Sequence, residues 1–292
     1  GIVSGDPEIT INDISILYDY SDGDYAYVGT IYDPNVGTFG SDISIAAANI
    51  IFGTSAGYNL LSGSKNVALG NEAMYTNKYG NYNVCLGPQA GYYSTGTSQV
   101  CIGTQAGYNY NTGTANTCIG FQSGYNGGTG GNNVFIGEHA GYGATASPSS
   151  NSYSFNVCLG LNAGYSLSSG IDNDLFGDSA GYNITTGNNS VCVGRHAGYN
   201  QAGATGNVFM GYQCGYSNTT GYTNVFIGEH AGYSNTNGQH NTYIGAHACR
   251  GSSSGSYNVF MGTHAGRSNT GSSNTFIGLS AGRNGSGVSN TY

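Results

Sequence analysis

The chain has 292 residues, of which 52 are Gly, 26 are Tyr and none is Trp, and only 7% are charged, with a net charge of −8. So much Gly disfavours an ordinary helical or α/β enzyme, because Gly weakens helices, and the absence of a three-residue Gly period excludes collagen. Regularly spaced aromatic and β-branched residues disfavour a disordered chain, and no apolar run approaches the roughly 20 residues of a membrane span. The composition therefore indicates an all-β chain built from a repeat.

The charge divides the chain into two parts. Residues 1–48 contain eight acidic and no basic residues, whereas residues 49–292 contain six of each. Because Ile9–Ile16 and Tyr25–Val28 alternate like strands, we expect 1–48 to be an acidic, β-rich connecting or capping segment. The lack of a basic stripe argues against nucleic-acid binding and against polybasic membrane docking. The chain ends inside a repeat unit, so we expect a fragment of a longer protein.

Residues 49–292 contain fourteen copies of the motif Asn-Val-x-Ile-Gly-x-x-Ala-Gly-Tyr, and its first Gly is taken as position zero of each copy. The copies are 17 residues apart, except for two spacings of 16 and one of 23. A unit this short fits one coil of a parallel β-solenoid, with a strand at −4 to −1, a turn at zero and a second short strand at +2 to +5. Stacked at about 4.8 Å, fourteen coils rise roughly 65–70 Å. The repeated Gly residues are Gly53, Gly70, Gly87, Gly103, Gly120, Gly137, Gly160, Gly177, Gly194, Gly211, Gly228, Gly245, Gly262 and Gly278.

The irregular spacings all change the same part of the unit. The extra residues of the 23-residue spacing fall within 143–155, after the Tyr of one copy and before the Asn of the next. The two short spacings lose a residue in the same part. We therefore expect a surface loop there, flanked by regular ladders.

Both faces of the predicted strand are apolar. Positions −3 and −1 share one face and position −2 lies on the other, because side chains alternate along a strand. An outer face of Cys, Phe and Leu along the whole solenoid would exceed the apolar patches of soluble monomers. We therefore expect a parallel homotrimer with its threefold axis along the solenoid. A monomer with a wider core is the alternative.

Two stretches carry a resemblance to a known family. Asn-Val-Phe-Ile-Gly-Glu-His-Ala-Gly-Tyr at 224–233 and Asn-Val-Ala-Leu-Gly at 66–70 resemble the head repeats of YadA-type trimeric autotransporter adhesins. They also resemble Gly-rich repeats in tail-fibre and adhesin proteins of bacteriophages and environmental bacteria. The resemblance covers 49–292, although YadA-type units are commonly somewhat shorter than 17 residues. It implies a trimeric, left-handed parallel β-roll used as a stalk or adhesive head.

Two repeat positions, each forming a column of side chains along the stacked coils, contain candidate binding residues. Position +2 holds five His residues, for which a hydrogen-bonding ladder is the simpler interpretation and a metal- or anion-binding column the alternative. Since no acidic ladder accompanies them, the sequence predicts no metal site. Position +5 is Tyr in eleven copies but Arg in the last three, where stacked guanidinium groups would repel unless an anionic group or solvent relieves them. We therefore expect an acidic partner, a following domain or an anionic glycan at Arg250, Arg267, Arg283, His230, His247 and His264.

The Tyr and Cys columns have structural interpretations. The repeated Tyr at +5 predicts that the rings of successive coils stack on one another, and a glycan-binding strip is the alternative interpretation. Five of the seven Cys residues occupy position −2. We expect them to be small buried side chains, although disulfides between adjacent coils are sterically conceivable. These five are Cys85, Cys101, Cys118, Cys158 and Cys192.

No Ser/His/Asp, paired-carboxylate or phosphate-loop arrangement stands out, so the sequence predicts no enzyme, no catalytic or cofactor-binding residue and no cofactor. We expect a structural and adhesive protein: a rigid extracellular fibre, in a virion tail or on a cell surface. It would present contacts to a host-surface receptor or glycan and join other fibre, baseplate or stalk segments. The alternatives are a self-assembling extracellular matrix filament and, less favoured, a glycan- or ice-binding solenoid.

Overall fold

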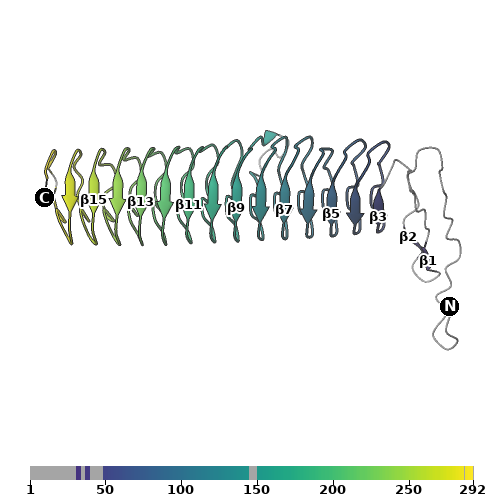
Figure 1. The fold of residues 1–292 in the computed structure, drawn as a ribbon, viewed down its shortest axis with the longest axis horizontal. Helices are drawn as coiled ribbons and strands as arrows, with labels where there is room; N and C mark the ends of the chain where they lie inside the picture. Colours follow the sequence, from purple (N-terminus) through teal and green to yellow (C-terminus); the bar gives the residue numbers. More distant parts are fainter. Residues whose placement is uncertain (1–30, 34–36, 40–48, 145–149, 286, 292) are drawn as a thin grey trace, which may run out of the picture.

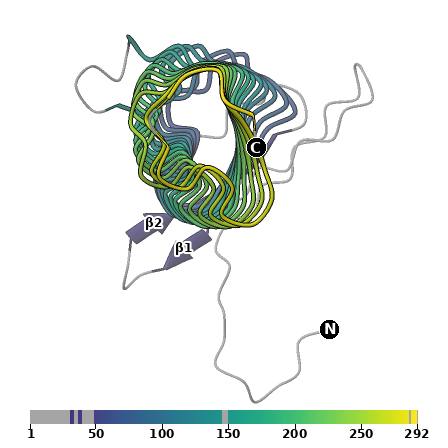
Figure 2. The same cartoon turned by 90° about the vertical axis from the view of Figure 1, so that its left-hand side faces the viewer.

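The computed structural model describes residues 31–33, 37–39, 49–144, 150–285 and 287–291. Within 49–291, fourteen strands of three residues form one parallel sheet in chain order, with one strand per coil (Figure 1). Viewed along the stack, successive coils superimpose around one closed outline (Figure 2). The predicted all-β parallel solenoid is confirmed. Its strands are β3 (Ile50–Phe52), β4 (Val67–Leu69), β5 (Val84–Leu86), β6 (Val100–Ile102), β7 (Thr117–Ile119), β8 (Val134–Ile136), β9 (Val157–Leu159), β10 (Asp174–Phe176), β11 (Val191–Val193), β12 (Val208–Met210), β13 (Val225–Ile227), β14 (Thr242–Ile244), β15 (Val259–Met261) and β16 (Thr275–Ile277).

The N-terminal segment contributes one short strand pair to the described residues. β1 (Ile31–Asp33) and β2 (Gly37–Phe39) pair antiparallel. The strands expected at 9–16 and 25–28 lie outside the described residues.

Strand register is independent of coil length. Val84 pairs with Val100 across a 16-residue spacing, and Val134 pairs with Val157 across the 23-residue spacing. Length differences are therefore confined to the segments between strands, as the sequence predicts. Residues 145–149 of the longest segment lie outside the described residues.

The predicted second strand at +2 to +5 is wrong, because two tight turns occupy this part of each coil. In the first coil the Ala56 N–H donates to the Gly53 carbonyl (3.2 Å), and the Leu60 N–H donates to the Gly57 carbonyl (2.9 Å). Ser55 at +2 and Gly57 at +4 have left-handed φ angles of 55° and 59°, which no extended strand accommodates. Hydrogen bonding between coils continues through the turns nevertheless, as from the Gly57 N–H to the Ala73 carbonyl (2.8 Å).

The Asn column at −4 fastens each coil to the next. The Asn224 Oδ1 accepts the backbone N–H of Asn241 (3.0 Å), and its Nδ2 donates to the Gly238 carbonyl (2.8 Å). These Asn side chains are buried along the sheet, so their amides satisfy backbone groups that water cannot reach. Ser190 departs from the column, and there the Gln201 amide fills the space and donates to the Ser190 Oγ.

The core is lined by the −2 side chains. From Ala68 onward every one of them is fully buried, including the five Cys residues. The expectation of an outer face made of Cys, Phe and Leu is therefore wrong. Side chains alternate between the two faces of a strand. In this three-residue strand the middle side chain therefore points inward and the two flanking side chains point outward.

Side-chain sizes compensate within the core. In the last five coils the −2 residue is aromatic, and the +7 position on the opposite wall holds a buried Asn or Ser or, in the last of them, the half-buried Gly285. Some earlier coils have the opposite arrangement: the small Cys101 is at −2, and the large, buried Tyr110 is at +7 of the same coil. In the next coil Gly127 leaves room for the Tyr110 ring, since a Cβ there would lie 2.0 Å from that ring. Large and small residues thus alternate between walls so that a narrow interior is filled.

The outer face of the sheet is an apolar strip two side chains wide. Its −1 column is Ile, Leu, Met, Phe or Val throughout, and its −3 column is mostly Val. The polar exceptions at −3 are Thr117, Asp174, Thr242 and Thr275. The more exposed −1 side chains range from 37% for Leu69 to 62% for Phe52. The strip runs the length of the 14-stranded sheet.

Candidate functional site

The +2 column is positioned by the first turn of each coil. Its residues adopt left-handed backbone angles, such as φ 54° for His230 and φ 60° for His264. His and Asn tolerate this conformation better than most residues, which explains part of the composition of the column. The His247 N–H donates to the Glu229 carbonyl of the preceding coil (2.8 Å), so successive +2 side chains lie in register.

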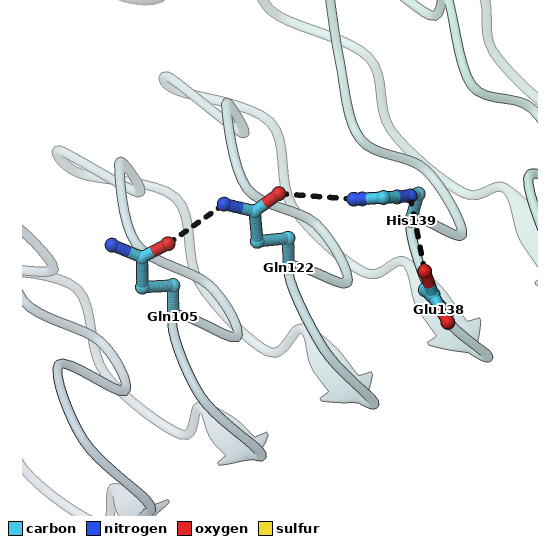
Figure 3. Close-up of polar contacts among 4 residues, drawn as sticks. All are labelled: Gln105, Gln122, Glu138 and His139. Atoms are coloured by element: carbon cyan, nitrogen blue, oxygen red, sulfur yellow. Dashed lines mark hydrogen bonds and ion pairs between the residues drawn. The ribbon is translucent and has the colours of Figure 1, made fainter.

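In the N-terminal half this column is a hydrogen-bonded ladder. The Gln122 amide donates to the Gln105 Oε1 (2.7 Å), and the His139 Nε2 lies 3.0 Å from the Gln122 Oε1 (Figure 3). The other ring nitrogen, Nδ1, lies 3.8 Å from a carboxylate oxygen of Glu138. The ladder interpretation is confirmed for these residues.

In the C-terminal half three of the predicted His residues come together on consecutive coils. The ring centroids of His230 and His247 are 5.2 Å apart, those of His247 and His264 are 5.1 Å apart, and the planes are nearly parallel. The His230 Nε2 lies 2.8 Å from the Gln213 Oε1 of the preceding coil. Its Nδ1 lies 3.4 Å from a carboxylate oxygen of Glu229.

The surroundings keep these rings unprotonated. Burial lowers the pKa of His230 and His247 below the usual 6.5, and the Arg250 guanidinium lowers both further. The Glu229 carboxylate acts in the opposite direction on each. Because the pKa falls, the rings are neutral near pH 7 and stack without repulsion between like charges.

The three Arg residues continue the Tyr column beside the His stack. The Arg250 guanidinium lies over the Tyr233 ring, 5.8 Å from its centroid, which is a cation–π contact. Among the described residues, none of the three forms an ion pair, whereas Arg195 lies 3.2 Å from an Asp178 carboxylate oxygen. The six predicted residues therefore lie in the last four coils of the solenoid.

The Tyr column is a continuous stack from Tyr58 to Tyr233. Adjacent centroids are 4.8 to 5.2 Å apart and the planes lie within 17° of each other. Most of the rings are half-buried, and burial raises the pKa of Tyr108 to about 12. The structural stacking interpretation is confirmed, and a glycan-binding role of the exposed ring edges stays a prediction.

The seven Cys residues, all described, are free and buried. The interpretation as small buried side chains is confirmed, and no disulfide joins adjacent coils. Burial raises the pKa of Cys192 and of Cys249 to about 12, which keeps both thiols protonated and unreactive.

Sequence reasoning missed the role of Gln213. It appears in the sequence only as one of several polar residues at +2, and the contact that orients His230 depends on the coil-to-coil register.

Searches of family models, curated proteins and solved structures found no match to this chain. In the part of the chain that the structure describes, no helix has the length and apolar character needed to cross a membrane.

Proposed function

We propose that this chain is the shaft of an extracellular structural and adhesive fibre, assembled as a parallel homotrimer. The observation that carries the proposal is the outer apolar strip of the sheet. It is two side chains wide and follows all fourteen strands, with Asp174 in β10 as its one charged residue. Soluble monomers rarely leave an apolar patch of such extent in water.

A second and third copy of this chain are the occupants that suit the strip. A partner that covers it must be as long as the solenoid and must present apolar groups at the same coil spacing. A parallel copy meets both conditions, and a threefold axis along the solenoid closes the assembly. Val and Ile side chains of three strips would then form a common core.

The adhesive part of the proposal rests on the charge of the last coils. Arg250, Arg267 and Arg283 place one cation per coil on a surface that otherwise has little charge. A receptor or glycan with repeated anionic groups matches this spacing. Three chains would add avidity to weak single contacts. Location on a virion tail fibre or a cell surface is part of the same proposal.

Solution mass and shape test the assembly. Light scattering should give three chains per particle, and X-ray scattering should give a rod. Replacing three outer-strip residues by Glu (Ile136→Glu, Met210→Glu and Met261→Glu) should yield monomers that keep the β-sheet circular dichroism. The matched control Tyr222→Glu changes an exposed apolar residue away from the strip and should leave the trimer intact.

A wild-type monomer would exclude the trimer. A mass and length that grow with concentration would instead favour the alternative, a self-assembling extracellular matrix filament.

Binding to an anionic polysaccharide tests the adhesive part. Heparin serves as the probe, and combined Arg250→Ala, Arg267→Ala and Arg283→Ala should abolish its retention without changing the mass. Arg195→Ala is the control, since its charge is already neutralised by Asp178. Equal retention of the triple variant and the wild type would contradict this part.

A further inference from the structure

We propose that Glu229, His230 and His247 form a binding site for a divalent transition-metal ion such as Zn²⁺. Each residue offers one ligand atom, and these three atoms lie within 4.8 Å of one another. The site joins two adjacent coils: Glu229 and His230 follow β13, and His247 follows β14. It is independent of the proposed fibre function.

The orientation of His230 leaves one nitrogen free for a ligand bond. The Gln213 Oε1 is an acceptor only, so at 2.8 Å it holds the ring hydrogen on Nε2. The Nδ1 then carries a lone pair, is buried and has no hydrogen-bond partner. Metal-binding His residues characteristically have their second nitrogen fixed in this way by a carbonyl or carboxylate oxygen.

The free nitrogen faces a second acceptor. The Glu229 carboxylate oxygen is 3.4 Å from the His230 Nδ1, and two lone-pair donors at that distance repel unless a cation lies between them. A metal ion satisfies both groups at once.

His247 supplies the third ligand from the next coil. Its Nδ1 is also buried and without a hydrogen-bond partner, and its ring lies 5.2 Å from that of His230. Because the rings are nearly parallel, we expect a modest ring rotation on binding.

Two imidazoles and one carboxylate select the class of metal. Zn²⁺, Ni²⁺ and Cu²⁺ favour nitrogen ligands, whereas Ca²⁺ and Mg²⁺ require oxygen ligands. The exposed side of Glu229 leaves a fourth position for water or an anion. Arg250 opposes the metal charge, so we expect a weaker site than a closed structural zinc site.

The same solenoid contains a natural half-site. Glu138, His139 and Gln122 repeat the arrangement, with distances of 3.8 Å to the carboxylate and 3.0 Å to the amide oxygen (Figure 3). The next coil, however, places Asn162 where the C-terminal site has His247. The backbone contact is the same in both, since Asn162 N–H donates to the Glu138 carbonyl (2.9 Å). Glu138 and His139 therefore serve as an internal control.

Calorimetric titration of the full chain with ZnCl₂ in chelator-free buffer tests the site. The wild type should bind one equivalent per chain. His247→Ala should abolish binding, and Gln213→Ala should weaken it about 10–100-fold, as loss of an orienting partner does. His139→Ala should leave binding unchanged. Circular dichroism confirms that each variant is folded.

A gain of binding provides the second test. Asn162→His should complete the half-site and raise the stoichiometry to two equivalents per chain. Absence of zinc binding by the wild type, or equal losses in His247→Ala and His139→Ala, would overturn the proposal. A folded Asn162→His variant that binds only one equivalent would contradict the ligand set.

Discussion

At the scale of single residues, left-handed backbone positions explain much of the repeat. The Gly residues at position zero have φ angles that other residues rarely adopt, such as 127° at Gly194. All of them except Gly278, in the last complete coil, also lie against the next coil, so neither conformation nor space admits a side chain there. Position +2 is less restrictive, since Ser, Gln and His adopt φ near 55° there. This difference explains why position zero is Gly in every copy, whereas the residue type at position +2 varies between copies.

Gly194→Ala should destabilise the solenoid. The new Cβ would lie 2.7 Å from the Gly211 carbonyl oxygen, so the backbone of the next coil must shift. We expect a loss of about 1–3 kcal/mol from backbone strain alone, measured by urea denaturation. Gly203→Ala is the control, because its nearest new contact is 3.4 Å away and its change should stay within about 0.5 kcal/mol. Equal effects of the two variants would contradict the role assigned to the zero column.

Asn224→Ala should also lower the unfolding free energy. The substitution leaves the buried N–H of Asn241 without its acceptor and removes one of two donors to the Gly238 carbonyl. One unsatisfied buried group costs about 1–3 kcal/mol. Hydrogen exchange at the Asn241 amide should show the loss directly. Asn237 is exposed, so the Asn237→Ala variant should keep the wild-type protection of that amide.

At the scale of elements, the strand and the turn at position zero could be predicted from sequence, and the turns over +2 to +5 could not. The alternating pattern at −3 to −1 marks the strand, and the 16- and 23-residue spacings locate the variable loop. The inward face could not be identified, because Val67 and Ala68 are both apolar and only the curvature of the coil decides which is buried. The turn at position +2 could not be predicted either, since Gln and His are not typical turn residues. The site was predicted as columns, but the Gln213 contact required the three-dimensional register.

Alkaline pH should unfold the solenoid through its half-buried Tyr column and its buried Cys residues. Burial raises the pKa of Tyr108 from 10.0, and that of Cys192 from 9.0, to about 12 in each case. A raised folded pKa means that the unfolded chain loses its proton first, so this stability is complete below about pH 9 and declines as pH rises toward 12. Denaturant midpoints between pH 7 and 12 should follow this decline. Tyr108→Phe keeps the ring and removes the proton, so its midpoint should fall less steeply between pH 10 and 12.

At the scale of the whole molecule, the solenoid is a one-dimensional array. Among the residues that the structure describes, each strand of the 14-stranded sheet pairs only with the strands of the adjacent coils. Stability is then approximately a sum over coils and coil interfaces, and no long-range contact fixes the number of coils.

Removal of a complete coil should therefore be tolerated better than removal of one core residue. Deletion of 207–223 joins Gly206 to Asn224 and restores a 17-residue spacing, so the shortened chain should keep its circular dichroism. X-ray scattering should show a rod shorter by about 5 Å. Deletion of Phe209 alone removes a buried side chain and shifts the strand register, so it should lower the melting temperature more than the larger deletion. The reverse order would show that coils are not interchangeable.

The direction of the hydrogen bonds between coils determines how the molecule responds to force. In the sheet they run from strand to strand, along the long axis of the stack (Figure 1). Tension between the two ends thus loads the coils in series, and an end coil peels away before the interior ones. A released 17-residue coil can extend to about 55 Å, compared with about 5 Å when stacked. The solenoid would therefore lengthen in steps under traction, absorbing work coil by coil instead of breaking at a single point.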